Sequence, residues 1–185
     1  GAMIFAASFA KGVPGFFPLV IVFAYWLFFR SFSFAKMIVY SAIVILSCAA
    51  IYGLILLIPD ARASLSIYVF ERLLGRVDAV PTVDSHFYIL IRLFMELLPL
   101  MVIVFLFHLV FRLKKIKHKP NKDAFRIIGF CTFVGICGSL PIMLTLVQKT
   151  FYMGASLPFF GIAFALLIAP ALADGISKIN IQSGG

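Results

Sequence analysis

Two ionisable residues, Arg92 and Glu96, lie inside a long apolar stretch of the sequence and are its first candidates for chemistry. In a helix, residues four positions apart project from one face, so the guanidinium and the carboxylate can pair. Ionisable groups at membrane depth often line a substrate path. The alternative is a structural ion pair whose charged ends reach toward the membrane surface. Pro99 favours the first interpretation, because a proline removes a backbone hydrogen bond and can kink a helix toward a cavity.

A second group of residues could hold an anion or move a proton. Lys11 precedes a turn rich in glycine and proline, and Lys149 precedes the aromatic residue Tyr152. An ammonium at the end of a span could bind the phosphate of a lipid head group, although a lysine there more often only extends its charge to the interface. His86 follows Asp84 by two residues and could act as an acid or base, or serve a structural role.

The other polar and sulfur-bearing residues indicate no soluble enzyme chemistry. His108 and His118 have no partner at metal-ligand spacing, and Cys48, Cys131 and Cys137 lie in apolar stretches where packing is the simplest role. The sequence contains no phosphate-binding loop, dinucleotide fingerprint, HExxH, GxSxG or CxxC motif. We therefore predict no cofactor, and leave dependence on a divalent metal open.

Composition places these residues in a membrane protein. Of the 185 residues 63% are hydrophobic and 12% are charged, whereas a soluble domain has about 25% charged residues. The mean hydropathy is +1.13. The net charge of +9 lies in basic clusters beside apolar stretches, where membrane topology and anionic lipids explain it better than nucleic acid does. We therefore predict membrane lipids as partners and no nucleic acid.

The apolar stretches predict an all-α, polytopic transmembrane bundle forming one domain over residues 1–185. Five stretches are predicted as full spans: Phe16–Phe29, Met37–Ile58, Phe87–Phe111, Ile127–Val147 and Phe151–Leu172.

Two further segments complete this plan. The stretch Ala2–Ala10 would reach only about 13 Å as a helix, against a hydrocarbon core of about 30 Å, so it is expected to be part of a longer element. Residues 61–77 place Ala63, Ile67 and Phe70 on one helical face, which predicts an amphipathic helix lying in the interface.

The basic residues give these spans an orientation. Alternation of spans brings ten of the sixteen basic residues to one side: Arg30, Lys36, Arg112, Lys114, Lys115, Lys117, Lys119, Lys122, Arg126 and Lys178. By the positive-inside rule this side, with the basic loop 112–126, is cytoplasmic. Segment 60–86 and Lys149 then lie outside. The outer side also carries most of the acidic residues.

Three short segments lie at ends of the predicted spans. Ala10–Leu19 is a Lys-Gly-Pro turn that leads into a span with leucine and proline, Gln148–Phe160 contains a lysine, a tyrosine and a proline, and Asp84–Tyr88 precedes the polar start of the next span. These segments resemble motifs of the bacterial GT-C membrane glycosyltransferases, the relatives of protein O-mannosyltransferases and of the aminoarabinose transferase that modifies lipid A. Ala155 stands where many members of that family have the first of two prolines in the late segment.

The resemblance implies transfer of a sugar from a polyprenyl-phosphate donor to an acceptor hydroxyl at the periplasmic face of a bacterial inner membrane. It implies that Lys11 and Lys149 stabilise the lipid phosphate. The residues expected to contact the donor or the acceptor are Lys11, Lys149, Tyr152, Arg92, Glu96 and His86. The family's catalytic Asp lies in an outer loop upstream of these motifs, so the chain is expected to be the C-terminal part of such an enzyme.

Two other classes of function fit the same sequence. Half of a transporter or flippase would use Arg92 and Glu96 to line a path and the helix breaks near Pro141 and Pro158 to form a site. A non-catalytic membrane subunit is the other alternative. An inverted internal repeat would favour transport, and the sequence contains no evident repeat.

Overall fold

The computed structural model of the chain describes residues 1–73, 82–113, 122–144, 146–148 and 150–183. Every regular element in these ranges is a helix, which confirms the predicted fold class. In chain order the elements are α1 (Ala2–Lys11), η1 (Val13–Val20), α2 (Ile21–Phe29), α3 (Phe34–Leu56), α4 (Pro59–Ile67), η2 (Tyr68–Leu73), α5 (Tyr88–Leu113), α6 (Lys122–Ser139), η4 (Leu140–Leu144), η5 (Thr150–Ala155) and α7 (Leu157–Ser183).

Within these described ranges, four helices are long and apolar enough to cross a membrane. They cover Phe34–Leu56, Tyr88–Leu113, Lys122–Met143 and Leu157–Asp174. Each corresponds to one of the predicted spans, with ends that differ by several residues. The chain is therefore a polytopic helical membrane protein. The last helix also continues past Pro170 and through the polar end of the sequence to Ser183.

The predicted span at 16–29 is a shorter apolar helix, Pro14–Phe29, of two kinds. Its first part, η1, is a 3₁₀ helix containing Pro14 and Pro18, and its second part, α2, is an α-helix. Proline has no N–H to donate, so Pro18, inside the helix, removes a hydrogen bond that an α-helix would need. Because a 3₁₀ helix rises about 2.0 Å per residue and an α-helix about 1.5 Å, the two parts together reach roughly 30 Å. That length matches the hydrocarbon core.

Local signals set the ends of α2, α3 and α4. Arg30 ends α2 in the left-handed conformation, with φ of 51°. Ser33 begins α3, because its Oγ accepts a hydrogen bond from the backbone N–H of Lys36 at 3.4 Å. Pro59 is the first residue of α4, where a missing N–H costs nothing.

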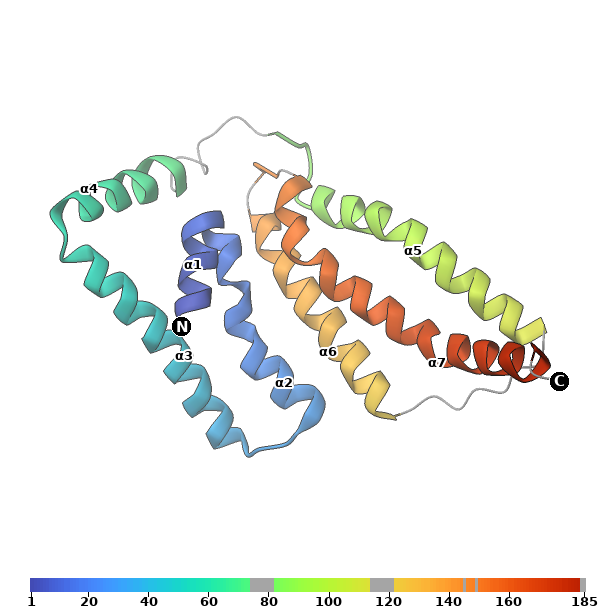
Figure 1. Cartoon of the computed structure of the whole chain (residues 1–185). Coiled ribbons are helices and arrows are strands. Elements are labelled where there is room, and N and C mark those ends of the chain that lie inside the picture. The colour runs from blue at the N-terminus through green and yellow to red at the C-terminus, as the bar shows by residue number, and fades with distance from the viewer. Residues whose placement is uncertain (74–81, 114–121, 145, 149, 184–185) are drawn as a thin grey trace.

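The long helices stand side by side in a row (Figure 1). Contacts run from α3 to α2, from α2 to α6, from α6 to α7 and from α7 to α5, while α1 packs on η1 and α3. The helix α4 turns away from the end of α3 and extends toward the end of α1 (Figure 1). Among the described residues, the Gly12 turn, α4, the start of α5 and the segments η4 and η5 therefore share one end of the molecule.

The core lies between α5, η4, η5 and α7. Its buried members are Ile89, Leu93, Leu97, Ile142, Met153 and Phe160. The three residues from α5 are spaced four apart, so a single stripe of this helix faces the bundle. The rest of α5 is largely exposed, as is α3, where Leu46 and Leu54 are each 66% exposed. Such apolar surface is suited to contact with lipid rather than water.

Small residues allow α6 to approach its neighbours closely. Gly135, Gly138 and Ser139 are buried, and Gly135 and Ser139 have the four-residue spacing found at membrane helix contacts. A Cβ at Gly135 would lie 2.8 Å from the ring of Phe160 in α7. Buried Ser139 and Ser156 also bring their Oγ atoms within 2.8 Å of each other. Because Ser156 Oγ donates to the carbonyl of Met153, the proton between the two hydroxyls comes from Ser139.

In the structure the predicted amphipathic helix at 61–77 begins earlier, at Pro59, and changes from an α-helix to a π-helix along its length. The α-helical part ends at Ile67, and η2 continues as a π-helix. Ala63, Ile67 and Phe70 are exposed, with Ile67 at 53% and Phe70 at 68%. The predicted apolar face thus points away from the rest of the chain. Residues 74–77 of the prediction lie outside the described residues.

Candidate functional site

A buried glutamine joins two segments that are far apart in the sequence. Gln148 is 4% exposed and follows η4 in the chain. Its side-chain oxygen accepts a hydrogen bond from the backbone N–H of Ile89 at 2.9 Å, and its side-chain nitrogen donates to the carbonyl of His86 at 2.9 Å. Its backbone N–H donates to Thr82 Oγ1 at 3.0 Å. Gln148 therefore satisfies one of the free N–H groups at the start of α5.

Thr82 and His86 make further contacts with the same segment. Thr82 donates from its backbone N–H to the carbonyl of Leu146 at 3.1 Å. His86 Nδ1 lies 2.7 Å from the carbonyl oxygen of Met143. A carbonyl only accepts hydrogen bonds, so Nδ1 carries a proton, and in the neutral ring the lone pair is on Nε2. His86 is exposed, and this arrangement gives it a fixed nitrogen that can accept a hydrogen bond from a ligand.

The Gly12 turn, which joins α1 to η1, lies at the same end of the molecule. Gly12 has φ of 68°, a conformation that favours glycine, and its N–H donates to the carbonyl of Ser8 at 2.7 Å. Gly15 lies against the backbone of Ala7, where a Cβ would collide. This close approach holds α1 beside η1. The predicted turn after Lys11 is confirmed.

Phe17 extends these contacts from η1 to α7. Its ring packs edge-on against the ring of Phe159, with centroids 6.0 Å apart. Gly138 of α6 lies between Phe17 and Ser156. As a result, the segments 10–19 and 84–88 both contact the segment 148–160 at one end of the bundle, although up to 150 residues separate them in the sequence.

The ion pair between Arg92 and Glu96 is present, as predicted. Arg92 Nη2 lies 2.8 Å from Glu96 Oε1, and the two side chains are 48% and 38% exposed. The pair lies outside the buried stripe of α5 that faces α7, so it does not join the Gln148 network.

The other predicted site residues are only partly described. Lys149 lies outside the described residues. Lys11 ends α1 and Tyr152 belongs to η5, but their side chains are not described. The end of α1 and the segment η5 lie at the end of the bundle where α5 begins (Figure 1). The described residues contain no group of three or more His, Cys, Asp or Glu side chains that could hold a metal ion.

Sequence reasoning did not single out Thr82 and Gln148 of this network, or the buried pair Ser139 and Ser156 between α6 and the start of α7. Gln148 lies in one of the motifs, but its role depends on a partner 59 residues away, at Ile89. The signal that could have identified it is a neutral amide between two long apolar stretches. Such a group needs hydrogen-bond partners when it is buried.

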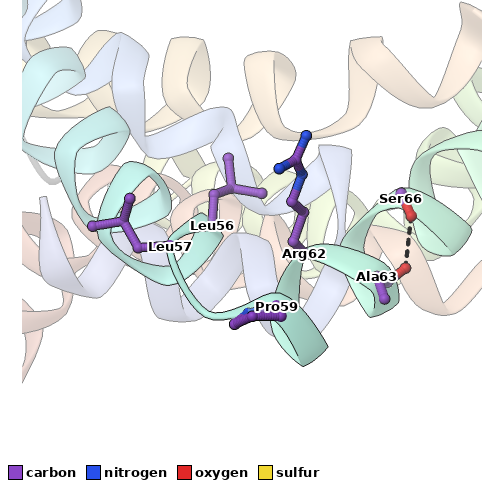
Figure 2. Close-up of a pocket in the computed structure, with 6 residues that line it drawn as sticks. All are labelled: Leu56, Leu57, Pro59, Arg62, Ala63 and Ser66. Carbon is purple, nitrogen blue, oxygen red and sulfur yellow. Dashed lines mark hydrogen bonds between the residues drawn. The ribbon is translucent and has the colours of Figure 1, made fainter.

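Two hollows flank α4. A cavity of about 560 Å³ lies between α1, α3 and α4. A second hollow of about 350 Å³ lies at the corner between α3 and α4, where Arg62 is its only charged lining residue. Figure 2 shows that the Arg62 side chain extends away from the α4 ribbon beside Leu56, while Ser66 bonds to the carbonyl of Ala63.

Comparison with known protein families, with characterised proteins and with solved structures finds no match to this chain. The four long apolar helices define the chain as a polytopic helical membrane protein.

Proposed function

We propose that this chain is part of a membrane glycosyltransferase that transfers a sugar from a polyprenyl-phosphate donor to an acceptor hydroxyl. The observation that carries the proposal is the meeting of three segments, 10–19, 84–88 and 148–160, at one end of the bundle. These are the segments whose residues resemble the GT-C enzymes. Segments that serve one reaction need to lie together, and unrelated loops have no such need.

The proposed reaction makes one bond and breaks one. The acceptor oxygen attacks the anomeric carbon of the sugar, and the bond from this carbon to the phosphate oxygen breaks with its electron pair. The acceptor proton passes to a base, for which the resemblance implies an Asp upstream of these motifs. The leaving phosphate needs positive charge, which we assign to Lys11 and Lys149. His86 Nε2 is assigned to accept a hydrogen bond from the acceptor.

The proposed orientation places this end of the bundle at the periplasmic face of a bacterial inner membrane. Its support is the charge at the opposite end, which the end of α2, the start of α3, the end of α5 and the start of α6 form (Figure 1). The basic residues in or beside these helix ends are all exposed: Arg30, Lys36, Arg112, Lys122 and Arg126. Basic ends of membrane proteins lie predominantly on the cytoplasmic side.

Binding of polyprenyl phosphate tests the proposal without knowledge of the sugar. The chain in lipid nanodiscs is expected to retain radiolabelled polyprenyl phosphate and to release it when unlabelled polyprenyl phosphate is added. Polyprenol, which has the same chain and no phosphate, is expected to compete poorly. Lys11→Ala and Lys149→Ala should each weaken retention about tenfold, whereas Lys36→Ala, at the opposite end, should not. Equal competition by polyprenol would contradict the proposal.

A further inference from the structure

The hollow at the corner between α3 and α4 combines a cation with an apolar wall. Its volume of about 350 Å³ falls within the range of about 300–1,000 Å³ that ligand sites occupy. Arg62 is the only charged residue among the described residues that line it, and its side chain extends from α4 beside Leu56 (Figure 2). The other lining residues are Leu56, Leu57, Pro59, Ala63 and Ser66.

The guanidinium of Arg62 is available to a ligand. Arg62 is exposed, and no carboxylate of the described residues forms an ion pair with it. Asp60 lies two residues earlier in α4, so the two side chains project about 200° apart around the helix axis. Ser66 Oγ donates to the carbonyl of Ala63 at 2.7 Å, and its proton is therefore used. Arg62 is thus the side-chain donor that the hollow offers, and it attracts an anion.

The hollow lies at the depth of the lipid head groups. The helix α3 has 23 residues, so it reaches about 34 Å, slightly more than the hydrocarbon core of about 30 Å. Leu56 is the last residue of α3, and Pro59 is the first residue of α4. The end of α3, with the hollow beside it, therefore falls where the hydrocarbon meets the phosphate layer of the bilayer.

The surface of α3 below the hollow is apolar and open. Gly53 lies one turn before Leu56 and Leu57, on the side of α3 between them. A Cβ at Gly53 would meet nothing within 4 Å, so none of the described residues covers this position. Leu57 is 78% exposed and Leu54 is 66% exposed. An acyl chain that packs along this surface brings its own head group to the level of Arg62.

The hollow faces away from the residues proposed to bind the sugar donor. Arg62 and Ser66 line the hollow, whereas Leu65 and Tyr68 line the cavity on the opposite face of α4, beside α1. The Gly12 turn lies on the cavity side, because a Cβ at Gly12 would collide with the hydroxyl of Tyr68. A ligand of the hollow therefore comes from the surrounding bilayer and not from the proposed donor site.

From this combination of charge, depth and apolar surface, we propose that the hollow binds the phosphate of an anionic membrane phospholipid at Arg62, with one acyl chain along α3 at Gly53 and Leu57. The planar guanidinium donates two parallel N–H bonds to two phosphate oxygens. Phospholipids are the most abundant phosphate-bearing lipids of a bilayer, so mass action favours them over scarcer ones. This site is separate from the proposed sugar transfer and involves no reaction.

Photo-crosslinking in nanodiscs tests the proposal on the whole chain. The probe is phosphatidylglycerol with a diazirine in one acyl chain, added as a minor component to phosphatidylcholine, and the labelled peptides are identified by mass spectrometry. We expect label on the second half of α3 and the start of α4. Arg62→Gln should reduce this label about tenfold, and Arg62→Lys should retain part of it. Arg126→Gln, which removes a cation already paired with Asp123, should leave the label unchanged.

Two further comparisons separate the head group from the hydrocarbon. Diacylglycerol with the same diazirine chain has no phosphate, and it should label the wild type as weakly as phosphatidylglycerol labels Arg62→Gln. Ala63→Trp, which fills the hollow, should reduce the phosphatidylglycerol label, whereas Ile67→Trp, at an exposed position that lines neither the hollow nor the cavity, should not.

Three outcomes would overturn the proposal. Equal labelling of the wild type by phosphatidylglycerol and diacylglycerol would show that the phosphate is not bound. Unchanged labelling of Arg62→Gln would show that Arg62 does not bind it. Displacement of the label by polyprenyl phosphate at a low molar ratio would show that the hollow belongs to the donor site. We expect Lys11→Ala, which weakens the proposed donor binding, to keep the full label.

Discussion

At the residue scale, the side chain of Gln148 has the largest structural role among the polar groups of the site. It connects the start of α5 to the segment between η4 and η5 through both atoms of its amide. Amides of this kind have one acceptor and two donors, and here the oxygen takes the N–H that opens a helix. A distant residue thus caps the N–H of Ile89, while the N–H groups of Tyr88 and Leu90 donate to the neighbouring carbonyls of Ser85 and Phe87.

Replacement of Gln148 should therefore be costly. Gln148→Leu leaves the N–H of Ile89 buried without its partner, and we expect a loss of about 1–3 kcal/mol in the free energy of unfolding. Denaturant unfolding in detergent micelles measures this loss. Ser85→Ala is the comparison, because Ser85 Oγ accepts from the N–H of Phe87 at 3.2 Å in an exposed position. A loss for Ser85→Ala as large as that for Gln148→Leu would contradict the interpretation.

The ion pair of α5 gives a second prediction at this scale. Arg92→Leu leaves Glu96 without its partner in an apolar helix, and the free energy of unfolding should fall by up to about 3 kcal/mol. The double change Arg92→Leu with Glu96→Leu should recover most of it, because no charge remains unpaired. Arg126→Leu breaks the pair with Asp123, which lies 3.3 Å away and is well exposed, and should have little effect.

This double-variant experiment also distinguishes a structural pair from a functional one. A structural pair predicts that the double variant keeps both stability and polyprenyl phosphate binding. Loss of binding with stability retained would instead place Arg92 and Glu96 in the substrate site. If the double variant recovers neither stability nor polyprenyl phosphate binding, Arg92 and Glu96 each have a separate partner.

At the element scale, the sequence predicted helices well where a long apolar stretch has clear ends. Phe34–Leu56 and Tyr88–Leu113 follow from hydropathy, and Ser33 and Pro59 carry recognisable end signals. Hydropathy could not predict η1, η4 and η5, because a 3₁₀ segment differs from an α-helix in its hydrogen bonds and not in its apolar content. The prolines of η1 were the available signal, but Pro14 predicts only a turn and Pro18 falls inside the predicted span 16–29.

The packing of α6 against α7 provides a test of close helix approach. Gly135→Ala places a methyl group 2.8 Å from the buried ring of Phe160, and overpacking of this kind costs about 1–3 kcal/mol. Gly161→Ala, in α7, meets nothing within 4 Å and should be neutral or slightly stabilising, since alanine favours helix more than glycine does. Unfolding in detergent compares the two variants. Equal losses would show that the α6 contact tolerates a larger residue.

At the scale of the whole molecule, the prediction that remains open is orientation. In a variant without the native cysteines, Ser85→Cys is expected to react with a membrane-impermeant maleimide added to intact cells, because it is exposed at the proposed outer end. Ser31→Cys, exposed at the basic end, should react only after the membrane is permeabilised. The reverse pattern would invert the proposed topology. Labelling at both positions in intact cells would indicate mixed insertion.

The candidate site could be predicted from the sequence only in part. The motifs pointed to the end of the bundle where they meet, and His86 lies there as expected. Sequence spacing also paired Arg92 with Glu96, because four residues span one helical turn. It could not show that this pair lies outside the buried stripe of α5. Which face of a membrane helix is buried depends on partners elsewhere in the chain, and on α5 these are Ile142, Met153 and Phe160.

The place of α5 at the edge of the row has a consequence for biogenesis. Its buried residues contact Ile142, Met153 and Phe160, and its first turn is capped by Gln148. All four partners are translated later than α5. The buried stripe of α5 therefore gains these partners only after synthesis has passed residue 142, and the last of them only after residue 160.

The composition of α5 allows it to enter the bilayer before these partners are synthesised. The most apolar window of α5 has a mean hydropathy of 2.5, the highest of the four spans, whereas that of α6 is 1.7. A segment of such hydropathy partitions from the translocon into lipid without help. The more polar α6, one third of whose window is buried, arrives when α2 is already in place to receive it. Because α5 is the most apolar of the four spans and its partners are translated later, it is the span best suited to enter lipid before it packs against its neighbours.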